Sequence, residues 1–132
     1  MARMTAEGDN HILNTYLKGV TRGTLYLGLY TDAAEPGESA ILSTITELPV
    51  ANGYARIVIA NADVTVVGSL ATIAQKTFTA SGGIWAAVTG WFLTNVASGT
   101  YGPLICVESF SDGARTILDG LTLKITPTFT AF

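Results

Sequence analysis

The chain is poor in the residues that catalysis and metal binding use most. Its 132 residues include one cysteine, one histidine and 13% charged residues, against roughly 25% charged residues in ordinary soluble domains. Cys106 cannot form an internal disulfide, and one histidine with one cysteine cannot supply a closed zinc site without carboxylates. No apolar run approaches the roughly 18 residues that a membrane-spanning helix requires. We therefore expect no disulfide, no zinc site and no membrane span.

Positive charge is scarce and scattered. Seven Lys and Arg against ten Asp and Glu give a net charge of −3, and the basic residues stand singly along the chain. Nucleic-acid binding needs a stripe of basic residues that displaces phosphate counterions, so we expect no direct nucleic-acid contact. The first ten residues contain no apolar stretch like a signal peptide, which favours synthesis in the cytoplasm.

Candidate catalytic and cofactor-binding groups are few. Any Ser-His-Asp or Cys-His arrangement would have to use His11, which stands near a predicted helix start where a solvated histidine is the ordinary outcome. Asp32, Glu35 and Glu38 are spaced by three residues, unlike the alternating ligands of a calcium loop, and favour a solvated acidic loop. We therefore expect no enzyme activity, no cofactor and no bound metal.

Hydrophobic periodicity predicts one helix followed by many strands. Apolar positions 12, 13, 16 and 17, a possible N-cap at Asp9 and a closing Gly19 predict a short amphipathic helix. From residue 24 to residue 31 the period is two, with leucines alternating with Tyr26, Gly28 and Tyr30. Further strand-like runs, separated by turn residues, cover residues 41–45, 54–59, 64–67, 71–79, 88–93, 104–110, 115–118 and 121–126. The predicted fold is all-β, an antiparallel, jelly-roll-like β-sandwich of about eight short strands with one short N-terminal helix.

The two ends of the chain are predicted to differ from the domain between them. Residues 1–8 are expected to form a polar N-terminal arm, residues 9–126 a single β-sandwich domain and residues 127–132 a C-terminal arm. The last residues alternate polar and apolar side chains, whereas chain ends are usually polar and frayed. This end is either a last strand packed on its own sheet or a strand, with Phe132, donated to a neighbouring subunit.

Two tryptophans stand an even number of residues apart. Trp85 and Trp91 would face the same side if their strand were continuous. Such a pair more often fills a sandwich core. The alternative is a subunit contact or a platform for carbohydrate, because tryptophan suits a surface that is apolar yet satisfies one donor.

The succession of these elements resembles a family of small virion proteins of tailed bacteriophages, described as capsid-decoration or tail-fibre-like proteins. The resemblance rests on a short helix ending in Leu-Lys-Gly (residues 12–19) and on Leu-Tyr-Leu-Gly-Leu-Tyr-Thr leading into an acidic Pro-Gly loop (residues 25–39). It continues with Gly-Tyr-Ala-Arg (residues 53–56), Trp-Ala-Ala-Val-Thr-Gly (residues 85–90) and Gly-Leu-Thr-Leu-Lys-Ile (residues 120–125).

This resemblance implies a non-enzymatic structural protein of the phage particle. We expect a capsid decoration or cement protein that is made in the host cytoplasm and lies on the head surface of the virion. Its expected partners are the major capsid protein and further copies of itself in a homotrimer. The residues expected to make assembly contacts are Ala2, Arg3, Met4, Tyr26, Tyr30, Phe129 and Phe132.

Two other classes of function stay open at this stage. The first is a tail-fibre or adhesin module that contacts the host surface through the tryptophans, the strand tyrosines and the acidic loop at residues 32–39. The second is a small lectin or carbohydrate-active enzyme, which would show saturable glycan binding or turnover.

Overall fold

The computed structural model describes residues 2–130, and it confirms a mostly β, antiparallel fold with one N-terminal helix. The described part contains twelve strands rather than about eight, because β1 and β12 form in the two predicted arms, the run 71–79 is divided into two strands, and a separate strand, β7, precedes β8. In chain order the elements are β1 (Arg3–Met4), α1 (Ala6–Lys18), β2 (Leu25–Tyr30), β3 (Ile57–Ile59), the 3-10 turn η1 (Asn61–Asp63), β4 (Val64–Val67), β5 (Leu70–Ile73), β6 (Lys76–Thr79), β7 (Trp85–Val88), β8 (Gly90–Thr94), β9 (Leu104–Ser109), β10 (Arg115–Ile117), β11 (Thr122–Ile125) and β12 (Thr128–Thr130).

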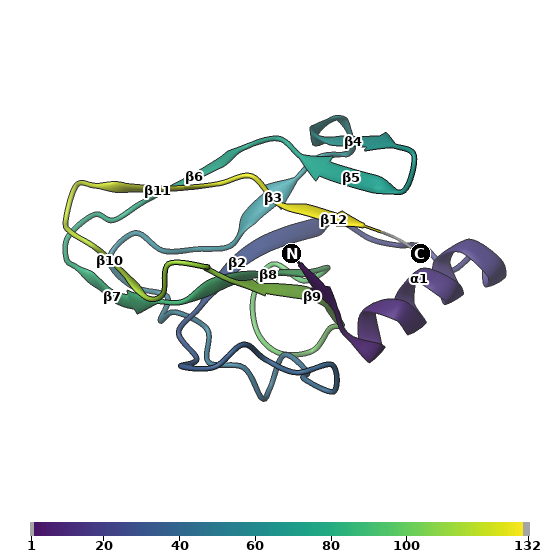
Figure 1. The fold of residues 1–132 in the computed structure, drawn as a ribbon, viewed down its shortest axis with the longest axis horizontal. Coiled ribbons are helices and arrows are strands. Elements are labelled where there is room, and N and C mark those ends of the chain that lie inside the picture. The colour runs from purple at the N-terminus through teal and green to yellow at the C-terminus, as the bar shows by residue number, and fades with distance from the viewer. Residues whose placement is uncertain (1, 131–132) are drawn as a thin grey trace.

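The strands form two layers (Figure 1). One layer is a five-stranded sheet in the order β1-β9-β8-β2-β3, and every pairing in it is antiparallel. The other side carries the three-stranded sheet β12-β5-β4 and the pair β11-β6, while β10 pairs with β7. The main hydrophobic core lies between the layers, with Leu27 and Leu29 from β2 packed in one cluster with Ile73, Phe78 and Leu123.

The five-stranded sheet is covered on both faces in its centre. Its second face packs Tyr30, Phe92, Leu104 and Val107 against Leu42 and Ile45 from the loop that follows β2. The first four residues of β9 are therefore all buried, as are the last four of β2. A strand that is buried on both faces has a continuous apolar sequence, so the alternation of its residues does not show which face packs on the main core.

The sequence predictions for two segments are wrong. Residues 41–45 form turns instead of a strand, because the Thr44 hydroxyl donates to the Ile41 carbonyl oxygen at 3.0 Å and accepts from the Ile41 amide at 3.0 Å. This local bonding competes with strand pairing. The helix starts at Ala6, with Thr5 instead of Asp9 as N-cap, since the Thr5 hydroxyl accepts from the Gly8 amide at 3.0 Å. Its predicted end is confirmed by Gly19, which is left-handed with φ 73°.

Both expected arms contribute a short strand to the domain's own sheets, and residues 6–8 begin the helix. Arg3 and Met4 of β1 pair with Val107 and Cys106 of β9. Residues 128–130 of β12 pair with β5, so the described part of the C-terminal arm belongs to the domain's own sheet. Phe132 lies outside the described residues.

Candidate functional site

Helix α1 is attached to the sandwich through its first turn. The Thr5 amide donates to the Ile105 carbonyl oxygen at 3.2 Å, the Thr5 hydroxyl donates to the Leu104 carbonyl oxygen, and the Ala6 amide donates to the Glu38 carbonyl oxygen at 2.9 Å. Gly8 lies directly on β9, where a Cβ would collide with the Ile105 carbonyl oxygen. The helix is therefore fixed to the edge of the main sheet at its start, and its later turns lie at the end of the sandwich (Figure 1).

The apolar stripe of α1 faces away from the core. Ile12 is 45% exposed, Leu13 55%, Tyr16 86% and Leu17 71%. These positions share one face of a helix, the spacing by which an amphipathic helix normally covers a core. The face turned towards the sandwich carries instead Gly8, which is buried, and the partly buried His11 and Thr15.

A second uncovered apolar element stands beside the helix. The β4-β5 hairpin exposes Val66 to 67%, Val67 to 72% and Leu70 to 42%. Its other side contributes Ile73 to the main core. The hairpin and the helix are thus two apolar elements at the same end of the molecule that the other residues in the range 2–130 do not cover.

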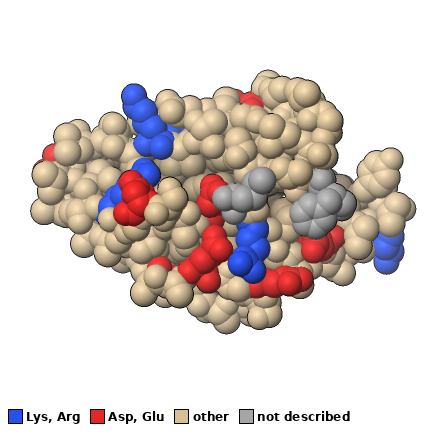
Figure 2. Space-filling model, in the orientation of Figure 1, with Lys and Arg blue, Asp and Glu red and all other residues tan. Residues whose placement is uncertain are grey.

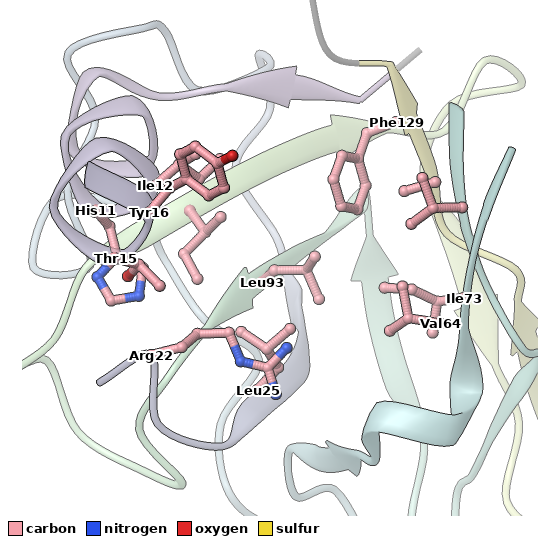
Figure 3. A pocket seen from close by; sticks show the side chains of 13 residues that line it. His11, Ile12, Thr15, Tyr16, Arg22, Leu25, Val64, Ile73, Leu93 and Phe129 are labelled. Carbon is pink, nitrogen blue, oxygen red and sulfur yellow. The ribbon is translucent and has the colours of Figure 1, made fainter. Parts of the chain in front are cut away.

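A groove of about 410 Å³ separates the helix from the hairpin (Figure 3). Ile12 and Tyr16 of α1 form one wall, and Val64, Ile73 and Phe129 form the opposite wall. Leu25 and Leu93 of the main sheet lie between the two walls. The groove is lined mainly by aliphatic and aromatic side chains, so its chemistry suits apolar contact instead of proton transfer.

The few polar groups in the groove differ from what the sequence suggested. His11 Nε2 and Thr15 Oγ1 are buried and have no hydrogen-bond partner within residues 2–130. His11 is therefore not the solvated residue that we expected. The Arg22 guanidinium also lines the groove and donates to the Asn61 side-chain oxygen at 2.5 Å and to the Gly23 carbonyl oxygen at 3.1 Å.

The residues predicted to make contacts near the N-terminus lie along the sheet edge. Ala2 and Met4 are partly buried against the main core. Arg3 is exposed, and its guanidinium stands 3.5 Å from a Glu35 carboxylate oxygen. This segment is folded onto the domain and does not form a separate arm within the described residues.

The predicted tyrosine face of β2 is mostly unavailable. Tyr30 is 0% exposed, and its hydroxyl lies 2.8 Å from the Ser109 hydroxyl. Burial raises the pKa of Tyr30 to about 12. Tyr26 is partly buried. The assignment of Tyr30 as an assembly contact is therefore wrong, because the sheet is covered on both faces at this strand.

Phe129 is the predicted contact residue that the structure brings to the groove. It is partly buried on β12, packs against the main core and lines the wall opposite α1. The groove itself was not predictable from the sequence, because its lining residues come from α1, β2, β4, β5, β8, β9, β12 and the segment before β2.

The two tryptophans are core residues. Trp85 and Trp91 are each 2% exposed, and their indole nitrogens donate to the Asn52 carbonyl oxygen at 2.9 Å and to a Glu108 carboxylate oxygen at 3.1 Å. Ala87, with φ 55°, lies within β7, and the chain leaves strand conformation between β7 and β8. The interpretation as core residues is confirmed, and the exposed aromatic platform is wrong.

Two carboxylates of the acidic loop accept hydrogen bonds from the backbone of neighbouring segments. Asp32 accepts from the Thr46 amide at 2.8 Å, and Glu35 accepts from the Ser109 amide at 3.1 Å. Among the described residues, no group of three or more histidine, cysteine, aspartate or glutamate side chains is placed to hold a metal ion.

A polar network that the sequence did not indicate lies beneath the Gly-Tyr-Ala-Arg element. Arg56, whose side chain is 3% exposed, donates to Glu47 at 2.7 and 2.9 Å and to the carbonyl oxygens of Val96 and Gly99. The Tyr54 hydroxyl donates to Glu47 at 2.6 Å. Burial, together with the neighbouring Glu47, raises the pKa of Tyr54. The network holds two loops to the main sheet and is structural.

Charge is thinly spread over the molecular surface. Figure 2 shows a few separate Lys, Arg, Asp and Glu side chains on a face that is mostly uncharged. Within residues 2–130, no helix has the length and hydrophobicity needed to cross a membrane.

Comparisons with known proteins do not assign the chain to a family. No family model matches its sequence, and no curated protein matches it either.

Proposed function

We propose that this chain is a structural protein of a tailed-bacteriophage particle, without enzyme activity. Its role would be that of a capsid decoration or cement protein, which binds the outer surface of the head and bridges coat subunits. The observation that carries the proposal is the group of exposed large apolar side chains that α1 and the β4-β5 hairpin bring together at one end of a charge-poor sandwich. The resemblance of its sequence elements to small phage virion proteins is the reason for proposing a phage particle as the assembly.

The physical role follows from the mechanics of a filled head. Packaged DNA presses outward on the shell, and a rigid β-module that contacts adjacent coat subunits adds interfaces that must break before the shell opens. Many modest interfaces act together through multivalency, so each one can be small. The proposed partners are the major capsid protein and other copies of this chain, arranged as a homotrimer with closed symmetry.

The number of copies in each particle tests the location. Quantitative mass spectrometry of purified particles, scaled to the major capsid protein, should give hundreds of copies of this chain. Particles stripped of it should release their DNA at a lower temperature than complete particles, and adding the purified chain back should restore resistance.

A small copy number would overturn the head location. A few copies to a few dozen would place the chain in the tail, as a fibre or adhesin module that contacts the host surface. Absence from washed particles would overturn the virion role altogether.

A further inference from the structure

The outer face of α1 carries more apolar surface than a helix that faces water normally exposes. A helix of 13 residues is marginal by itself in water, since helices in proteins gain most of their stability by packing an apolar face. In this chain only the first turn is anchored by backbone hydrogen bonds to β9 and to the Glu38 carbonyl oxygen. The apolar stripe with Leu13, Tyr16 and Leu17 has no cover from the described chain. Packing for this stripe therefore has to come from outside the described residues.

A small ligand would not complete this end of the molecule. The groove of about 410 Å³ is within the range of small-molecule sites. Leu13, Leu17 and Val67, however, lie outside its lining and are 55%, 71% and 72% exposed. A molecule confined to the groove would leave all three in water, so the occupant is large enough to cover the helix, the groove and the hairpin together.

We infer that this end is a contact between copies of the chain. We call it the α1-hairpin surface, and it consists of the α1 stripe, the exposed side of β4-β5 and the groove between them. From their exposed fractions, the large apolar residues of the surface expose on the order of 900 Å², close to the roughly 800 Å² that each partner contributes to a standard interface.

The shape and charge of the α1-hairpin surface favour a second copy as occupant. The surface carries both a ridge, headed by Tyr16, and a groove, so in a closed oligomer each copy can place its ridge over the groove of a neighbour. The large exposed side chains of the ridge and hairpin are uncharged, and Arg22, the cation that lines the groove, already donates to the Asn61 side-chain oxygen. The inference rests on the part of the proposed function that joins copies of the chain in an oligomer, and it names the surface through which they meet; its test uses the purified chain, so its outcome is separate from that of the head location.

Sedimentation velocity on the purified full chain tests the inference. Between about 1 and 100 µM, a range that corresponds to ordinary interface affinities, the chain should form an oligomer of defined mass. Leu17→Asp on the helix and Val67→Asp on the hairpin should each weaken association by on the order of 100-fold, because each places a charge in an apolar contact. Both positions are exposed in the single chain, so neither change should unfold it.

Matched controls separate the α1-hairpin surface from general surface effects. Val50→Asp and Tyr101→Ser change residues outside the α1-hairpin surface that are 74% and 97% exposed. Both should associate like the unmodified chain. Fluorescence of the buried Trp85 and Trp91 reports whether each variant is folded.

Three outcomes would overturn the inference. The first is a chain that stays monomeric throughout the concentration range, which would assign the surface to a different partner such as a coat subunit or an apolar ligand. The second is an oligomer that Leu17→Asp does not weaken. The third is an oligomer that Val67→Asp does not weaken. A copy number in phage particles bears on the proposed function and leaves this result unchanged.

Discussion

Leucines on β2 and leucines on α1 have opposite environments in the same small molecule. Leu27 and Leu29 are 0% exposed between the two layers, whereas Leu13 and Leu17 are 55% and 71% exposed. The difference is one of assembly instead of composition. The centre of the sandwich is covered by its own chain, and the α1 end has an apolar surface of the same kind that the described part of the chain leaves exposed.

The polar groups show the same contrast. In the closed region the Arg56 guanidinium, the Tyr54 hydroxyl and the Trp91 indole nitrogen all have hydrogen-bond partners. At the α1 end His11 Nε2 and Thr15 Oγ1 have none within residues 2–130. Since a buried polar group without a partner costs about 1 to 3 kcal/mol, the chain is well adapted in one region and incompletely packed in the other.

The largest effect is expected where the main sheet is closed on its second face. Phe92 is 0% exposed, so Phe92→Ala should lower the free energy of unfolding by about 3 to 5 kcal/mol through lost burial and a residual cavity. Urea unfolding followed by tryptophan fluorescence measures it. Tyr101→Ala, at a residue 97% exposed, is the control, and a loss below about 1 kcal/mol at Phe92 would contradict a closed core.

The buried ion pair should contribute the next largest effect. Glu47→Gln keeps an oxygen for the Tyr54 hydroxyl but removes the charge opposite Arg56, which is 3% exposed. We expect a loss of about 2 to 3 kcal/mol, less than for a fully buried pair because Glu47 is 24% exposed. Glu38→Gln, at an exposed glutamate, is the matched control in the same unfolding assay. Equal stability of the two variants would show that the network is dispensable.

The anchor of α1 should be sensitive to a single methyl group. Gly8→Ala places a Cβ against the Ile105 carbonyl oxygen, and overpacking of this kind costs about 1 to 3 kcal/mol. Hydrogen exchange should speed up in α1 more than in β8. At Gly37 a Cβ would meet open space, so Gly37→Ala is the control. Unchanged exchange in α1 would mean that the helix is held in some other way.

High pH should destabilise the closed region through its buried tyrosines. The pKa of Tyr30 is raised to about 12 and that of Tyr54 is also raised, both mainly by burial. The folded state therefore holds these protons more tightly than the unfolded chain, so their contribution is complete below about pH 10 and is lost as pH rises further. Stability should fall by up to about 1.4 kcal/mol per pH unit for each tyrosine.

Tyrosine variants identify the source of that slope. Tyr54→Phe should make the fall of stability above about pH 10 shallower, whereas Tyr16→Phe, at a residue 86% exposed, should leave it unchanged. Urea midpoints between about pH 8 and pH 11 measure both. A slope that Tyr54→Phe does not reduce would refute this origin.

The smallest effect is expected on the open side. Leu17→Ser, measured at a concentration where the chain is monomeric, should change the free energy of unfolding by less than about 0.5 kcal/mol, because Leu17 is 71% exposed. A loss above about 2 kcal/mol would mean that the stripe is covered by the chain itself, and the contrast between the two regions would disappear.

Strand positions were predictable where local pattern and turn residues agree. Residues 64–67 were predicted as a strand and form β4, and the run 24–31 contains β2. The run 71–79 is split into β5 and β6. Residues 41–45 are apolar enough for a strand, but the Thr44 side chain bonds to its own backbone neighbourhood. Such competition depends on side-chain geometry that periodicity does not contain.

The candidate site was not predictable from the same pattern. Apolar positions 12, 13, 16 and 17 identify an amphipathic helix but not the direction in which its stripe points. That direction is fixed by the contact of Gly8 with Ile105, two residues that are far apart in sequence. The prediction that the tyrosines of β2 form an exposed face failed for a related reason. Alternating residues indicate one buried face, whereas β2 is covered on both of its faces.

The burial of Cys106 makes its thiol a probe for the opening of the main sheet. The thiol is 0% exposed on β9, in register with Met4 of β1 and Leu93 of β8, and burial raises its pKa. A thiol reagent reaches it only when these strands separate, and the sequence contains no other cysteine to compete. The rate of labelling of the natural chain therefore times the opening of the main sheet, without any dye or substitution.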